Sequence, residues 1–165
     1  MMKKITILLF IVSLSWLPAA TAAEPIKACQ VVTRTEAEKA AGVHVADGRL
    51  TEFEEKIMQG TTLCHFESLD AEHYKRFVSI ELTVAASDAE AAEKFSDALS
   101  LVNAPETVKG IGEEAAWGGA ISGPKGGLNI RQGKYYLQIK VSRGDEKKNL
   151  QQAEILAKKA LPRLP

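Results

Sequence analysis

The chain has 165 residues, of which 45% are hydrophobic, and its 21 basic side chains are matched by 21 acidic ones. This length favours one domain, large enough to bury a core without dense cross-linking. The charge balance gives no electrostatic basis for binding nucleic acid, so that class of partner is not expected.

A targeting segment is expected at the N-terminus. Lys3 and Lys4 form a basic region, the run over 5–17 is mostly apolar, and a small-residue cleavage motif follows at 20–22. The apolar run is too short for a comfortable membrane span, and no later stretch approaches ~18 apolar residues. We therefore expect a periplasmic or secreted protein whose mature chain has no membrane span. The predicted division is a cleaved signal peptide over 1–23 and a single domain over 24–165.

The only two cysteines, Cys29 and Cys64, predict a disulfide. Exported proteins meet oxidising conditions, in which two cysteines are most simply paired with each other. The cross-link would stabilise the folded chain by roughly 3–4 kcal/mol on the chain-entropy model, because it closes a loop in the unfolded chain. A redox or nucleophilic pair is the alternative, but there is no C-x-x-C motif.

The first half of the domain predicts one short helix and several strands. Thr33 and Glu36 fit a capping box ahead of an alanine face, and Gly42 is a typical C-terminal stop. Asp47-Gly48 predicts a tight hairpin turn. Strands are expected over 61–67 and 74–85.

The second half predicts two longer helices with about three strands between them. Ser87 and Glu90 fit a capping box at the start of a strongly amphipathic helix, and Asp145 begins the last helix. Between them we expect a strand or turn region over 108–117 and a glycine-rich loop over 118–127.

The clearest hairpin lies between Gly127 and Arg143. If Gln132-Gly133 is its turn, Ile130 faces Tyr135, and Leu128 faces Leu137. One register then sorts the apolar residues to one face and the polar ones to the other. The polar face carries Asn129, Arg131, Lys134, Tyr136, Gln138 and Lys140.

These elements predict an α+β fold: an antiparallel sheet of about five to six strands with two or three helices packed on one face. Two smaller helix-on-sheet halves side by side are the alternative. We expect Phe95 and Leu99 to be buried together with Val78, Ile80 and Leu82.

Residues 110–115, Gly-Ile-Gly-Glu-Glu-Ala, match a dinucleotide-binding pattern, which requires a strand before it and a helix after it. Trp117-Gly118-Gly119 follows and is a poor helix start, so the glycines are interpreted as turn residues and no cofactor is expected.

The sequence offers no convergent catalytic or metal-binding set. His44, His65 and His73 are the only histidines, and we interpret them as surface residues because zinc needs three or four convergent ligands. Glu113 and Glu114 are adjacent on an expected strand and face opposite sides, so they cannot form a glycosidase pair. No serine lies in a G-x-S-x-G motif.

The segment 110–117, the strand that ends at Gly133 and the final helix resemble a pattern in uncharacterised secreted bacterial lipoproteins and, more distantly, in extracellular sensor domains of bacterial serine/threonine kinases. In those proteins a Gly-x-Gly-acid-x-Ala segment precedes a hairpin and a C-terminal helix. The resemblance covers about the last third of the chain. It implies an α+β domain without known catalysis and assigns no functional residue.

The polar hairpin face is the best site that the sequence offers. Its aromatic and cationic side chains fit an envelope protein or an anionic glycan. A solvated face whose lysines prevent edge-to-edge pairing is the alternative. We therefore expect a non-enzymatic binding or interaction domain, with a small hydrolase or metal-dependent enzyme as the alternative. The predicted binding residues are Arg131, Lys134, Tyr136, Lys140 and Trp117.

Overall fold

A computed structural model describes residues 24–55, 58–118 and 126–165. In these ranges the chain forms one seven-stranded antiparallel sheet with strand order β1-β2-β3-β7-β6-β5-β4. The α+β class is confirmed, with more strands than expected. The predicted signal peptide and most of the glycine-rich loop lie outside the described residues. The elements are α1 (Ala28–Val31), α2 (Arg34–Ala41), β1 (Arg49–Glu52), β2 (Thr61–Glu67), η2 (Ala71–His73), β3 (Phe77–Val84), α3 (Asp88–Ser100), β4 (Glu106–Thr107), β5 (Glu114–Gly118), β6 (Gly127–Gln132), β7 (Tyr135–Ser142), α4 (Glu146–Ala160) and η3 (Leu161–Arg163).

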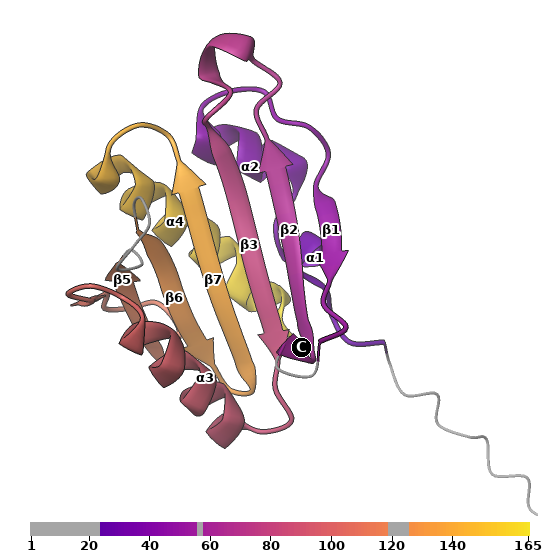
Figure 1. Ribbon diagram of the computed structural model, residues 1–165. Coiled ribbons are helices and arrows are strands. Elements are labelled where there is room, and N and C mark those ends of the chain that lie inside the picture. Colours follow the sequence, from indigo (N-terminus) through magenta and orange to yellow (C-terminus); the bar gives the residue numbers. More distant parts are fainter. Residues whose placement is uncertain (1–23, 56–57, 119–125) are drawn as a thin grey trace, which may run out of the picture.

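Helices lie on both faces of the sheet (Figure 1). Helices α1, α2 and α4 cover one face, and α3 lies on the other, over β6 and β7. The main core lies under the first three helices, where alternate strand residues point inward. At its centre Ile80 of β3 sits opposite Ile139 of β7 and Cys64 of β2. Burying side chains of this size stabilises the fold by roughly 1.5–3 kcal/mol each.

The β6–β7 hairpin has the predicted faces but not the predicted register. Ile130 lies opposite Leu137, and the two-residue turn is Gly133-Lys134. Gly133 has φ +52°, which a hairpin turn of this kind needs at its first central position. The register differs by two residues, so every side chain keeps its face, because side chains alternate with a period of two.

Asp47-Gly48 does not form a hairpin turn. The segment around it runs along β2 instead: Val45 bridges Ser68, and Arg49 pairs with His65. Three residues on this edge oppose two on β2, so the edge bulges. A Cβ on Gly48 would lie 2.6 Å from Cys64 Sγ, which explains the glycine as a point of close approach.

The expected position of α3 is wrong. Its Phe95 is buried, but in a second cluster with Ala116 and Tyr136, on the face opposite Val78 and Ile80. The apolar periodicity of the helix correctly predicts that one side is buried. It says nothing about which face of the sheet receives that side.

The Cys29–Cys64 disulfide is confirmed and joins α1 to β2. Thr33 and Glu36 form the predicted capping box of α2, and Gly42 ends this helix with φ +69°. Within the described ranges, no helix is both long and apolar enough to cross a membrane.

Candidate functional site: the loop between β2 and β3

The five residues predicted to form a binding face do not share one surface. Tyr136 is buried beneath α3, and its hydroxyl donates to Asn129 Oδ1 at 2.9 Å. Burial raises the pKa of Tyr136, and the negative charge of Glu81 raises it further. This tyrosine therefore belongs to a buried hydrogen-bond network and is not a contact surface.

Arg131 is engaged by two carboxylates. Its Nε donates to Glu114 Oε2 at 2.6 Å, and its Nη1 donates to Glu113. Glu113 also accepts a hydrogen bond from the backbone N–H of Gly133. The cluster joins the segment before β5 to the hairpin, and its two carboxylates neutralise the positive charge of Arg131 within the fold.

The remaining predicted residues are separated. Trp117 is buried on the α4 side of the sheet, where its Nε1 donates to Glu146 Oε1 at 3.3 Å. Lys134 is exposed at the hairpin turn, with its Nζ 5.6 Å from the centre of the Tyr135 ring. Lys140 is exposed on β7, so only the two lysines present their charges freely.

The glycines of the Gly-x-Gly motif serve a turn, as interpreted from the sequence. Gly112 has φ +58°, and a Cβ there would lie 2.7 Å from the carbonyl oxygen of Arg131. Strand β5 follows the motif where a dinucleotide site would need a helix.

A different region has the properties of a contact site: the loop over residues 68–76 between β2 and β3. It projects beyond the end of the sheet (Figure 1). Its base is closed by the Ser68 N–H, which donates to the carbonyl of Arg76 at 3.1 Å. The Leu69 N–H donates to the carbonyl of His44 at 2.9 Å, which attaches the loop to the segment after α2.

Asp70 organises the inside of the loop. Its Oδ1 accepts from the N–H of Glu72 at 2.9 Å, and its Oδ2 lies 2.8 Å from His73 Nδ1. A carboxylate only accepts, so Nδ1 of His73 carries the proton. The hydrogen bond from His73 holds the pKa of Asp70 below its usual value, and the N–H of Glu72 adds to this effect. The loop is thus fixed by short local hydrogen bonds.

Two large side chains of this loop are left in solvent. Leu69 is 63% exposed and Tyr74 is 69% exposed. Neither packs on the core, although the loop that carries them is well fixed. Both therefore remain available for a contact outside the chain.

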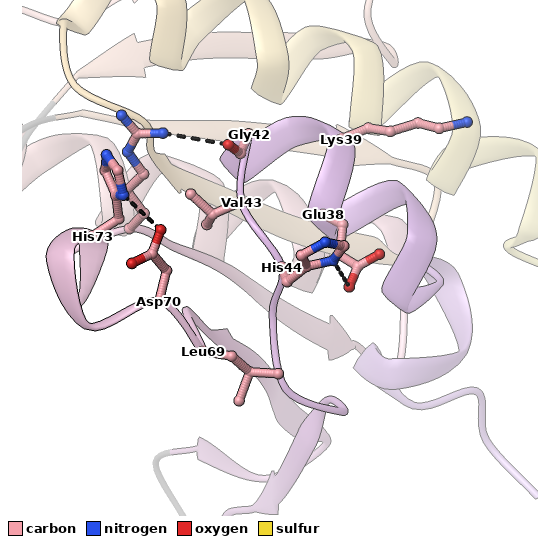
Figure 2. Close-up of a pocket in the computed structure, with 9 residues that line it drawn as sticks. Glu38, Lys39, Gly42, Val43, His44, Leu69, Asp70 and His73 are labelled. Atoms are coloured by element: carbon pink, nitrogen blue, oxygen red, sulfur yellow. Dashed lines mark hydrogen bonds and ion pairs between the residues drawn. The ribbon is translucent and has the colours of Figure 1, made fainter.

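Hollows flank the loop on both sides. The first has a volume of about 700 Å³ and lies between the loop and the C-terminal end of α2. Figure 2 shows His73 with Asp70 on one side of it and His44 with Glu38 on the other. The second hollow, of about 360 Å³, lies between the loop and the connection from β7 to α4.

The histidine–carboxylate pairs of the first hollow do not form a metal site. In the part of the chain that the structure describes, no three His, Cys, Asp or Glu side chains are placed to hold a metal ion. His44 Nδ1 lies 3.4 Å from Glu38 Oε1, but its side chain is almost fully exposed. His65 lies elsewhere, on β2, where its ring is tilted against the ring of Phe77 at 5.3 Å between centroids.

The sequence predicts strands over 61–67 and 74–85, which treats residues 68–73 as a polar loop and places Tyr74 in a strand, whereas β3 begins at Phe77. The available signal was the presence of Leu69 and Tyr74 in an otherwise polar stretch that fits neither helical nor strand periodicity. A second signal was Ser68-x-Asp70, a pattern that favours local side-chain to backbone hydrogen bonds.

No protein-family model matches the chain, and no curated protein matches its sequence.

Proposed function

We propose that this protein is an exported, non-enzymatic interaction domain that docks a partner protein through the loop over 68–76. The observation that carries the proposal is the exposure of Leu69 and Tyr74 on a loop whose backbone is fixed by Asp70. Leu69 and Tyr74 supply apolar contact area, and the hydrogen bonds of the loop reduce the entropy lost on binding.

The residue types of the loop suit a protein partner. Tyrosine and arginine are enriched among the residues that dominate binding energy, and Tyr74 lies close to Lys75 and Arg76 in the chain. Burying a side chain such as Leu69 contributes roughly 1.5–3 kcal/mol. The partner that fits is an envelope protein with an apolar pocket and carboxylates at its rim.

Export is part of the proposal. The basic and apolar pattern over 1–17, followed by the small-residue motif at 20–22, supports a secretory route into the periplasm or medium. The disulfide between Cys29 and Cys64 suits an oxidising compartment.

The test is photo-crosslinking in cells followed by affinity measurement. A photo-reactive phenylalanine analogue at position 74 should give one discrete adduct, whose partner is then identified and purified. The matched control is the same analogue at Leu101, which is 66% exposed at the end of α3, well away from the loop (Figure 1).

Leu69→Ser and Tyr74→Ser should each weaken the affinity for the purified partner about tenfold or more, which corresponds to roughly 1.4 kcal/mol. Leu101→Ser should leave it unchanged. Equal affinities for all three variants and the parent protein would overturn the proposal.

A further inference from the structure

The six arginines of the chain fall into two groups. Four are bound to carboxylates: Arg34 to Asp47, Arg49 to Glu67, Arg131 to Glu113 and Glu114, and Arg163 to Glu36. Within the described ranges, Arg76 and Arg143 have no carboxylate within 4.0 Å.

Arg76 and Arg143 come together at the C-terminal end of α2. Nη1 of Arg143 donates to the carbonyl of Lys39 at 3.2 Å, and Nη1 of Arg76 donates to the carbonyl of Gly42 at 3.4 Å. A Cβ on Gly42 would lie 3.0 Å from Nε of Arg143, so glycine leaves room for this guanidinium. The backbone N–H of Arg143 donates to Asn149 Oδ1 at 2.8 Å, which fixes the start of its side chain.

Among the described residues, these contacts use only a minority of the donors of each guanidinium. A guanidinium has five N–H donors in a planar fork, and each arginine gives one to a carbonyl. A helix C-terminus attracts cations, which accounts for one hydrogen bond from each arginine but not for two arginines at the same place. The remaining N–H groups of both guanidiniums are available to a ligand.

Both arginines line the second hollow, a cleft of about 360 Å³ between the loop over 68–76 and the connection from β7 to α4. Lys75 adds a third cation to the wall, and Glu72 is the one carboxylate among its lining residues. Three positive charges against one negative charge leave a local excess of about two, in a chain whose acidic and basic residues balance overall.

We propose that this cleft binds a doubly negative oxyanion, and that a phosphomonoester is the class that fits it. Guanidinium forks pair with phosphate oxygens through two parallel hydrogen bonds, and a phosphomonoester carries about −1.5 to −2 charge at pH 7. The ligand charge therefore matches the charge excess of the cleft. The site goes beyond the proposed partner docking, because it adds Arg143 from outside the loop and does not include Leu69 among its lining residues.

The test uses the intact protein and three probes at constant ionic strength: inorganic phosphate, glycerol phosphate and succinate. Binding is followed by amide chemical shifts and by calorimetry. Glycerol phosphate should bind saturably at one site, with shifts at residues 72–76 and 142–144. Succinate should bind at least tenfold more weakly.

Arg76→Gln and Arg143→Gln should each weaken binding tenfold or more, whereas Arg49→Gln, the matched control on an ion-paired arginine, should not. Arg76→Lys and Arg143→Lys keep the positive charge and the contact with α2, but they lose the planar guanidinium. Both variants should therefore bind phosphate more weakly than the parent and keep the parent's Tm. Leu69→Ser should keep phosphate binding, which separates this proposal from the docking proposal.

A lack of saturation with either phosphate probe would overturn the site. An equal loss of binding in Arg49→Gln would also overturn it, because the effect would then be one of net charge. Tighter binding of succinate than of glycerol phosphate would overturn the assignment to phosphomonoesters.

Discussion

The β6–β7 hairpin and the loop between β2 and β3 both place a tyrosine among basic side chains. In the hairpin, Tyr136 is buried under α3, and Arg131 is held by two carboxylates. In the loop, Tyr74 is mostly exposed, and Arg76 has no carboxylate partner among the described residues. The same residue types stabilise the fold in one region and remain available in the other.

The difference comes from the surroundings of each region. The hairpin lies at the centre of the sheet, where a helix and neighbouring strands supply partners for its polar groups. The loop extends past the end of the sheet, so its hydrogen bonds run within the loop or to the segment after α2, and its larger side chains meet solvent. Residue type alone therefore does not distinguish a side chain that stabilises the fold from one that is exposed to solvent.

The largest effect on stability is expected where α3 packs on the hairpin. Phe95→Ala should lower the free energy of unfolding by about 3 kcal/mol, because it leaves a cavity above Tyr136 and Ala116. Urea denaturation measures this change. Leu101→Ala on the exposed end of the same helix should cost less than about 0.5 kcal/mol. A loss below about 1 kcal/mol for Phe95→Ala would mean that α3 contributes little packing to this face of the sheet.

Next in size is the arginine of the hairpin. Arg131→Glu should destabilise the protein by roughly 2 kcal/mol, because Glu113 and Glu114 lose their shared partner and face a third negative charge. Lys134→Glu, the exposed neighbour at the turn, should change stability by less than about 0.5 kcal/mol. Equal effects of the two variants would show that Arg131 is no more engaged than a surface lysine.

A smaller effect concerns another arginine that the fold engages. Arg163 lowers the pKa of Glu36 to about 2 through side-chain hydrogen bonds. The unfolded pKa is about 4.3, so the stabilisation is present above that pH and is lost as the pH falls through about 2. Because Arg163 is partly exposed, we expect about 1 kcal/mol after solvent screening.

Denaturation at several pH values in parent and Glu36→Gln checks this linkage. The parent should lose stability relative to the variant between pH 4.3 and pH 2. Parallel curves over that range would show that the ion pair adds nothing to folding.

The smallest effect is expected at the docking loop. Leu69→Ala and Tyr74→Ala should each change the free energy of unfolding by less than about 0.5 kcal/mol, because neither side chain packs on the core. Thermal and urea denaturation measure this. A loss of more than 1 kcal/mol would mean that these residues serve the fold, and the contrast with the hairpin would fail.

Local sequence signals were enough to predict much of the fold. Alternation placed Ile80 and Ile139 inward, and the capping box at Thr33 fixed the start of α2. The position of Phe95 could not be predicted in this way, because helical periodicity carries no information about which sheet face is free. The cleft lined by Arg76 and Arg143 depends on residues still further apart in the sequence, because these two arginines come to line one cleft only after β3 has paired with β7.

That pairing also has a consequence for how the chain folds. Strand β3 lies between β2 and β7, and its first residue, Phe77, is paired with Ser142. Contacts between residues so distant in sequence form slowly, because the chain loses the conformational entropy of the intervening loop before the contact stabilises it. The edge of β3 that pairs with β7 therefore stays unpaired until the last third of the chain joins the sheet. We expect slow folding in which the pairing of β7 with β3 sets the rate.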